Sequence, residues 1–337
     1  MREIKPFSTT GIGSLPHRRA SEAVELTLGS LDIPFWPQLP HVSFREQMIP
    51  QYSEGMPSIK IDEKKESVWI ERNDEEIARS YESLGVDARV AISEDYAKGL
   101  YKFLDTIKAR RFEILKGHIT GPLTFTLGLK DKDGRVLFYD EELREIALML
   151  LKAKARWQVD ALGAFAKGVI IFIDEPILSA LGTSAYLGVS SEEVSRMLSE
   201  TAEAIRQVGG ISGIHCCGRA DWPVVLKSGV DIMNFDAYSF GDTLAMYPAE
   251  VTAFLERGGY LAWGIVPTSD DIDKENEDSI IALFHKRVQE ITSAGVPREL
   301  LLKRIILTPS CGTGSRTVEQ TMKIFQILMG LKEEVAG

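Results

Sequence analysis

Residues 168–173 (GVIIFI) form an apolar run rich in β-branched side chains, and residues 174–176 (DEP) follow it directly. Such a run, ending in polar residues and proline, indicates a buried strand of a parallel sheet. Seven further runs of this kind lie at residues 10–14, 34–39, 113–119, 213–217, 231–235, 260–265 and 304–307. The chain therefore repeats one buried strand many times.

Amphipathic stretches separate these runs. Apolar side chains recur at helical spacing within residues 140–165, and Ser190 before residues 191–208 is a typical helix N-cap. Residues 270–295 and 317–331 show similar patterns. Eight strand–helix repeats predict a (β/α)₈ TIM barrel rather than an open doubly wound sheet. The open alternative lacks its G-x-G-x-x-G turn, because Pro16 follows the glycine pair at residues 11–13.

We expect one catalytic barrel over residues 1–337, without a second domain, since no stretch has the composition of a linker. Polar and apolar residues alternate over residues 60–72, which predicts an inserted hairpin near residues 58–72.

Composition narrows the function classes. The chain has 337 residues, 44% hydrophobic and 26% charged, with a formal net charge of −10. An acidic surface repels phosphate backbones, so a nucleic-acid partner is not expected. Neither a signal peptide nor a membrane span is evident, and the three cysteines are too few for a disulfide framework. We therefore expect a cytoplasmic protein without a membrane partner.

Metal-binding side chains occur where the predicted strands end. His215 and Cys217 are two residues apart in one strand, so their side chains point the same way while Cys216 points the other way. Cys311 follows the last strand, and barrel closure would bring its thiol to the same rim. One imidazole and two thiolates with an open fourth position match a catalytic zinc site. The alternative is that the cysteines are small buried side chains and His215 is a hydrogen-bonded core residue.

The sequence also resembles a known superfamily, that of cobalamin-independent methionine synthase and uroporphyrinogen decarboxylase. It is most similar to the C-terminal catalytic barrel of the methionine synthases. The motifs that carry the resemblance, in chain order, are residues 9–16 (TTGIGSLP), 121–124 (GPLT), 173–176 (IDEP), 215–217 (HCC), 231–236 (DIMNFD) and 309–312 (PSCG) with Arg316.

The resemblance implies roles for these residues. His215, Cys217 and Cys311 would bind zinc, and Asp236 would stand where the family has a glutamate, as an exchangeable fourth ligand. Ser14 and the backbone near Ile12 would bind the carboxylate of homocysteine, and Asp174 its ammonium. The zinc-bound thiolate would then accept a methyl group. From the residues alone, the alternative for Asp174 is a helix N-cap, and the alternative for Ser14 is a turn hydroxyl.

Departures from the family pattern bear on the substrates. The chain has one barrel where the full-length synthases have two, and residues 177–181 (ILSAL) lack the family's pterin-binding glutamate. These differences favour a corrinoid donor, either methylcobalamin or a corrinoid protein, over folate. The second strand offers only Gln38 in place of an amine-binding glutamate, so another small thiol such as coenzyme M stays open as acceptor.

Two other functions remain as alternatives. A decarboxylase of the uroporphyrinogen type would need no metal, but it would leave the H-x-C motif at residues 215–217 unexplained. A barrel that binds a metal or a corrinoid without catalysis is the other alternative. Zinc content tests the first, and a methyl-transfer assay tests the second.

Overall fold

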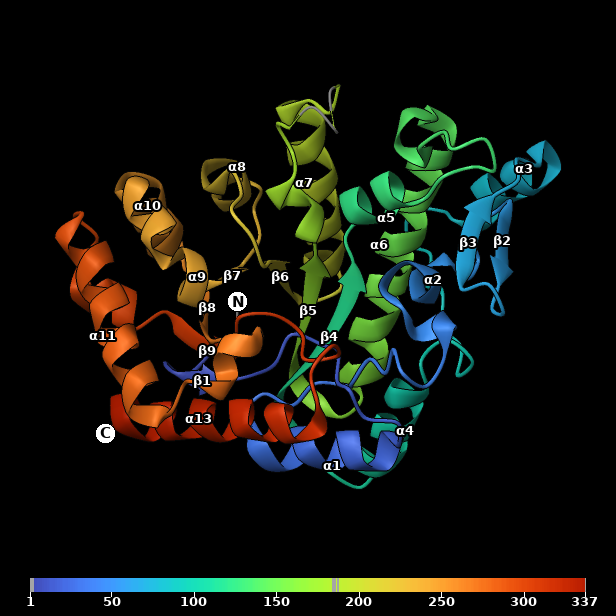
Figure 1. The fold of residues 1–337 in the computed structure, drawn as a ribbon. Coiled ribbons are helices and arrows are strands. Elements are labelled where there is room, and N and C mark those ends of the chain that lie inside the picture. Colours follow the sequence, from blue (N-terminus) through green and yellow to red (C-terminus); the bar gives the residue numbers. More distant parts are fainter. Residues whose placement is uncertain (1–2, 184–185, 187, 337) are drawn as a thin grey trace.

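The computed structural model describes residues 3–183, 186 and 188–336. Parallel strands alternate with helices along the chain, as Figure 1 shows. The strands of the main sheet are β1 (Ser8–Thr9), β4 (Phe112–Thr120), β5 (Ala166–Asp174), β6 (Ile211–Cys216), β7 (Ile232–Phe235), β8 (Tyr260–Val266) and β9 (Ile305–Pro309). They pair in the order β1-β9-β8-β7-β6-β5-β4, with every pair parallel.

An eighth extended segment closes the sheet into a barrel. The Ile33 N–H donates to the Thr9 carbonyl at 3.0 Å, and the Lys116 N–H donates to the Pro34 carbonyl at 2.9 Å. Bridges Phe35–Lys116 and Ser14–Gln38 continue this pairing. Residues 33–38 thus join β1 to β4, and the expected (β/α)₈ barrel is confirmed.

The first two strands are less regular than expected. Residues 34–39 form isolated bridges instead of a continuous ladder, because Pro34 and Pro37 have no N–H to donate. Beyond Thr9, the first strand passes close to two rings. A Cβ added to Gly11 would lie 2.3 Å from the Phe35 ring, and one added to Gly13 would lie 3.0 Å from His118. Glycine permits both approaches.

Helices cover the outside of the barrel in Figure 1. The α-helices are α1 (Ala20–Ser30), α2 (Met48–Ser53), α3 (Asp74–Ser83), α4 (Lys98–Ile107), α5 (Pro122–Gly128), α6 (Glu141–Gly163), α7 (Ser191–Gln207), α8 (Trp222–Lys227), α9 (Ala237–Phe240), α10 (Pro248–Glu256), α11 (Glu277–Ser293), α12 (Arg298–Leu302) and α13 (Val318–Ala336). Short 3₁₀ turns are η1 (Phe44–Glu46), η2 (Leu137–Tyr139), η3 (Pro176–Ser179), η5 (Gly241–Met246) and η6 (Asp270–Asp273).

One expected helix begins later than its sequence pattern suggests. Residues 270–295 divide into η6 and α11, because Asn276 and Ser279 form a reciprocal capping box that starts α11 at Glu277. The inserted hairpin is present, with β2 (Ile59–Asp62) antiparallel to β3 (Ser67–Ile70). In Figure 1 it lies with α3 to one side of the barrel.

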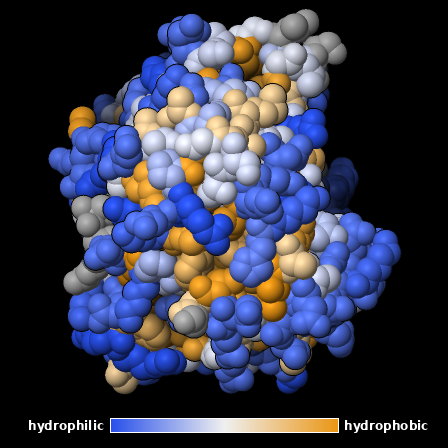
Figure 2. Space-filling model, turned by 90° about the vertical axis from the view of Figure 1, so that its left-hand side faces the viewer, coloured by the Kyte–Doolittle hydropathy of each residue, from blue (hydrophilic) through white to orange (hydrophobic). Residues whose placement is uncertain are grey.

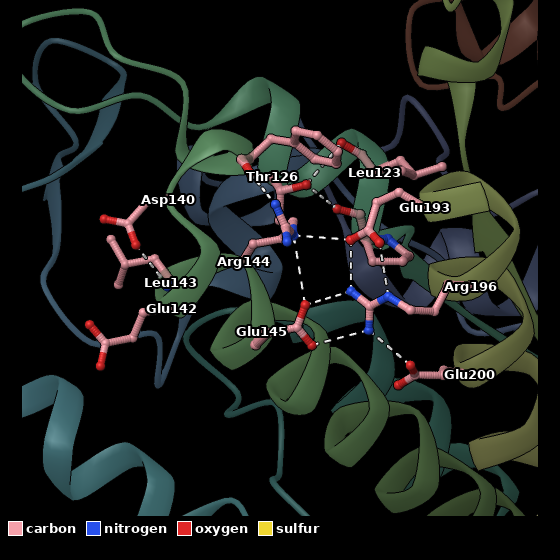
Figure 3. Close-up of polar contacts among 12 residues, drawn as sticks. Leu123, Thr126, Asp140, Glu142, Leu143, Arg144, Glu145, Glu193, Arg196 and Glu200 are labelled. Carbon is pink, nitrogen blue, oxygen red and sulfur yellow. Dashed lines mark hydrogen bonds and ion pairs between the residues drawn. The ribbon is translucent and has the colours of Figure 1, made fainter. Parts of the chain in front are cut away.

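Ion pairs fasten α6 to α7, the helices that flank β5. Arg196 of α7 contacts Glu193 at 2.7 Å and Glu200 at 2.9 Å, and it also binds Glu145 of α6. Arg144 of α6 contacts Glu193 at 3.0 Å, which completes the network drawn in Figure 3. These contacts fix the outer layer behind the strand that carries Asp174.

The barrel interior changes character from one end to the other. Alternate residues of the central strands form a buried apolar layer that includes Ile114, Ile170, Ile211 and Ile232. Toward the C-terminal ends of the strands, the inward positions become polar. They carry Lys116, His118, Asp174, His215, Asn234 and Thr308, all of them buried.

The outer surface is mainly polar on the face drawn in Figure 2, where hydrophilic residues surround a smaller apolar area. No helix in the described part of the chain is long and apolar enough to cross a membrane.

Candidate metal centre

Three metal-ligating side chains converge at the C-terminal end of the barrel strands. His215 lies near the end of β6, Cys217 follows β6 directly, and Cys311 follows β9. Their ligand atoms all lie within 4.8 Å of one another, and Cys311 Sγ is 3.6 Å from His215 Nε2. Within residues 3–183, 186 and 188–336, no other group of His, Cys, Asp and Glu side chains is as well placed to hold a metal ion.

The alternation of strand side chains separates the two neighbouring cysteines. Cys216 is buried in the apolar layer between the sheet and the helices, where burial raises the pKa of its thiol to about 12. Cys217 is on the opposite side with His215. A neutral, buried thiol at Cys216 has the properties of a packing residue.

Close backbone contact positions Cys311. A Cβ added to Gly264 of β8 would lie 2.7 Å from the Ser310 Cα, so the absence of a side chain lets the end of β9 approach β8. The Ser310 N–H donates to the Val266 carbonyl at 2.8 Å, and the Thr268 N–H donates to Ser310 Oγ at 3.0 Å. These bonds turn the chain so that Cys311 faces His215.

Asn234 orients the imidazole of His215. It is the register partner of His215 on β7, and its Oδ1 contacts His215 Nδ1. Asn234 Nδ2 donates to the Ala262 carbonyl at 2.9 Å and to Thr308 Oγ1 at 2.8 Å. Because a carbonyl only accepts, the amide nitrogen must face Ala262, and Oδ1 must face the ring. Nδ1 then carries the proton, and the lone pair of Nε2 points toward the thiols.

Contacts among the three residues shift their pKa values in opposite directions. Hydrogen bonds from Cys311 and His215 lower the pKa of the Cys217 thiol to about 4. The same contact with Cys217, followed by burial, raises the pKa of Cys311. Burial opposes protonation of His215, but its hydrogen bond to Cys217 raises the pKa of the ring. Two thiolates at this distance therefore need additional positive charge.

Asp174 and Lys116 form a second polar group in the barrel interior. Asp174 Oδ1 is buried without a hydrogen-bond partner, and burial raises the pKa of the carboxyl to about 6 although His215 and Lys116 oppose the shift. Lys116 is fully buried, and its ammonium lies 4.2 Å from the centre of the Phe172 ring and donates to the Ile12 carbonyl. Burial lowers its pKa to about 7. The free carboxylate oxygen is suited to a cationic ligand group.

The neighbouring acid, Glu175, has a different environment. Its carboxylate accepts from the N–H groups of Leu123 at 2.8 Å and Thr124 at 2.7 Å, and from the Thr124 hydroxyl at 2.6 Å. A Cβ on Gly121 would lie only 2.1 Å from this carboxyl group. Residues 121–124 and 173–176 therefore interlock, with Glu175 capping α5.

The remaining residues predicted for the site have mixed environments. Asp236 is buried and caps α9 by accepting from the Ser239 N–H at 2.8 Å, and it lies outside the group formed by His215, Cys217 and Cys311. Gln38 Nε2 donates to Gln51 Oε1 at 2.8 Å, so its amide is directed toward α2.

The first strand places Ile12 and Ser14 beside the last loop. Ile12 contributes its carbonyl to Lys116, and the Ser14 carbonyl accepts from the Thr313 N–H at 2.9 Å. His118, for which the sequence indicates no role, is buried against Trp36 with ring centres 4.0 Å apart, and neither ring nitrogen has a partner.

Two buried polar residues of the site, Asn234 and Lys116, are not among the residues that the sequence predicts. Asn234 lies two residues before Asp236, which the sequence predicts as a site residue, and Lys116 lies two residues before His118. Since strand side chains alternate, that spacing places each on the same face as its neighbour. Polar residues at alternate positions of otherwise apolar strands were the signal available.

Comparison with known proteins supports the fold. A B12-independent methionine synthase from Shewanella sp. W3-18-1, solved with selenomethionine, aligns with a TM-score of 0.60 at 14% identity over 98% of both chains. A candidate vitamin-B12-independent methionine synthase from Listeria monocytogenes aligns with a TM-score of 0.52 at 13% identity over 100% of both chains. No family model matches the sequence, and no curated protein is similar enough to count as a relative. At these identities the likeness shows a shared barrel fold.

Proposed function

We propose that this chain is a zinc-dependent methyltransferase that moves a methyl group to the thiol of homocysteine and so forms methionine. The observation that carries the proposal is the convergence of His215, Cys217 and Cys311 within 4.8 Å at the mouth of the barrel. The description of two structures of similar fold as methionine synthases agrees with it, as does the selenomethionine bound to one of them.

The donor set fits zinc. Two thiolates and one imidazole leave a fourth position open, which is typical of catalytic zinc sites. Soft sulfur ligands favour zinc over magnesium or calcium. The opposed pKa shifts of Cys217 and Cys311 support the same conclusion, because only added positive charge would allow both thiols to ionise.

The chemistry that zinc supplies when bound is the deprotonation and fixing of a substrate thiol, whose pKa of about 8.5 would otherwise keep it protonated at neutral pH. The protein residues then orient the acceptor. In this proposal Asp174 binds the ammonium of the amino acid through its unpartnered Oδ1. Ser14 and the backbone near Ile12 would bind its carboxylate, and Asp236 would serve as an exchangeable fourth ligand of the metal.

The unpartnered Oδ1 of Asp174 favours homocysteine over coenzyme M. A buried acceptor without a partner is costly, and an ammonium group would satisfy it. Coenzyme M carries a sulfonate in place of an amino-acid head group, so it would bring a negative charge toward Asp174.

For the methyl donor we propose a corrinoid, either methylcobalamin or a corrinoid protein. Residues 177–181 (ILSAL) lack the carboxylate that the folate-dependent synthases carry there, and Ala180 stands at the position of their glutamate. The names of the two structural neighbours point instead to a donor without B12, so both donors belong in the assay.

Metal analysis and a donor–acceptor assay test the proposal together. Purified protein should hold one zinc ion per chain and methylate homocysteine from methylcobalamin, with little activity from methyl-tetrahydrofolate or toward coenzyme M. Cys217→Ser and Cys311→Ser should lose stoichiometric zinc.

Cys216→Ser is the matched control, since that thiol lies on the other side of the strand and should not affect zinc content. Full zinc retention by both ligand variants would contradict the metal site. Activity with folate alone would contradict the donor.

A further inference from the structure

The loop that carries Cys311 is fastened to the first strand of the barrel. Residues 310–316 follow β9, and residues 11–15 follow β1, so nearly the whole chain separates them. The Thr313 N–H donates to the Ser14 carbonyl at 2.9 Å, and the Thr313 hydroxyl donates to the same oxygen at 3.3 Å. Ser14 therefore accepts two bonds from this loop through its backbone alone.

The Ser14 side chain adds a third bond and a packing contact. The Gly314 N–H donates to Ser14 Oγ at 3.3 Å. A Cβ added to Gly312 would lie 2.2 Å from Ser14 Oγ and 3.4 Å from Ser14 Cβ. The hydroxyl thus lies directly against the residue that follows Cys311. Gly312 does not have a positive φ, so its backbone is open to alanine and only this contact excludes a side chain.

Ser14 is itself held on a rigid support. The Gln38 N–H donates to the Gly13 carbonyl at 3.0 Å, and the Leu15 N–H donates to the Gln38 carbonyl at 2.9 Å. The buried ammonium of Lys116 binds the Ile12 carbonyl. Bonds on either side of Ser14 fix its backbone. The loop residues that contact Ser14 are therefore held in place as well.

The other end of the loop is also anchored. Arg316 Nη1 contacts Asp270 Oδ1 at 2.5 Å, and His41 Nε2 lies 2.8 Å from the Gly314 carbonyl. Cys311 lies between Ser310, which is bonded to the end of β8, and Gly312, which packs against Ser14 in the segment after β1. Of the atoms around Gly312, Ser14 Oγ is the nearest.

We propose that Ser14 is a positioning residue for Cys311, holding the loop so that the second thiol reaches the metal beside His215 and Cys217. The inference rests on the proposed zinc site, and it gives Ser14 a role besides contact with the substrate carboxylate. As Ser14 Oγ accepts from Gly314, its own O–H proton stays free to donate to a ligand. Ser14 would then contact both the carboxylate of the substrate and the loop that holds the metal ligand Cys311.

Zinc affinity of the substrate-free protein separates this role from substrate binding. Ser14→Ala removes the acceptor of the Gly314 N–H, and zinc affinity measured against a competing chelator should fall by about threefold to tenfold, the usual effect of one hydrogen bond. Gly312→Ala forces its new Cβ against Ser14 Oγ, and affinity should fall by about tenfold as the loop shifts. The absorption spectrum of the Co²⁺-substituted protein should change less in Ser14→Ala than in Gly312→Ala.

The double variant is the decisive measurement. In Ser14→Ala/Gly312→Ala the clashing oxygen is gone, and the two Cβ atoms would be 3.4 Å apart, an ordinary contact. Its zinc affinity should equal that of Ser14→Ala alone, so the second change becomes silent. Cys216→Ser serves as the control for general effects on zinc retention.

The outcomes distinguish the inference from the proposed function. If wild-type protein binds no zinc, the metal site itself is wrong. If it binds zinc, and Ser14→Ala and Gly312→Ala both keep wild-type affinity while Ser14→Ala raises only the KM for the thiol, Ser14 contacts substrate without positioning Cys311. The inference would also be overturned if Gly312→Ala lowered zinc affinity equally in the wild type and in Ser14→Ala.

Discussion

Replacement of Asn234 by leucine tests whether the imidazole of His215 is held for metal binding by its partner on β7. Leucine has nearly the same shape but accepts no hydrogen bond from His215 Nδ1. The ring is then free to rotate or to carry its proton on Nε2, the nitrogen whose lone pair would bind the metal. Loss of such a support typically lowers metal affinity by about 10- to 100-fold, or about 1.4–2.7 kcal/mol.

Asn234→Asp is the matched variant. A carboxylate still accepts from Nδ1, so His215 keeps its tautomer, but the donors to the Ala262 carbonyl and Thr308 Oγ1 are lost. We expect near wild-type zinc affinity together with a lower free energy of unfolding, by about 1–3 kcal/mol for the unpaired carbonyl. Asn234→Leu should lose both zinc affinity and stability.

Chelator competition measures the first quantity, and urea unfolding of the zinc-free protein measures the second. The order of zinc affinities should be wild type and Asn234→Asp above Asn234→Leu. Zinc binding by Asn234→Leu as tight as that of the wild type would refute the orienting role of Asn234.

The remaining predictions concern buried charge and packing. Burial lowers the pKa of Lys116 to about 7, below its unfolded value, so the stability linked to its neutral form is complete above about pH 10.5 and is lost as the pH falls to 7. Lys116→Met carries no such charge, so its unfolding free energy should rise relative to that of the wild type by a few kcal/mol as the pH falls from 10.5 to 7, at about 1.4 kcal/mol per pKa unit. Urea unfolding of the zinc-free proteins measures this difference, and a difference that does not change with pH would contradict the prediction. Glu175→Ala leaves the Leu123 and Thr124 N–H groups without their acceptor and should cost about 2–4 kcal/mol of unfolding free energy while zinc stoichiometry stays intact. If Glu175→Ala lost zinc without losing stability, the structural role of Glu175 as the cap of α5 would be wrong. A double-mutant cycle on Arg196 and Glu145, which are partly exposed, should give a coupling of about 1 kcal/mol or less that declines with salt; a coupling unaffected by salt would show a desolvated pair.

The order of elements was readable from the sequence because it depends on local periodicity. Apolar runs rich in β-branched residues predicted the strands. Helical spacing with polar caps predicted α6 and α7 to within a residue or two. The position of His215 and Cys217 on one face followed from the same rule, since residues two apart in a strand point the same way. The start of α11 was misplaced, because the capping box at Asn276 competes with the earlier acidic turn.

Tertiary structure alone decided how distant segments meet. Closure of the barrel depends on hydrogen bonds from residues 33–38 to both β1 and β4, and that closure brings Ser14 against the Cys311 loop. The amide of Asn234 finds His215 only through the register between β6 and β7. The physical reason is that periodicity reports which face of an element is buried, whereas strand register and loop contacts are set by pairing between residues far apart in the chain. The ligand types were thus present in the sequence, and the fold determined their distances, protonation and support.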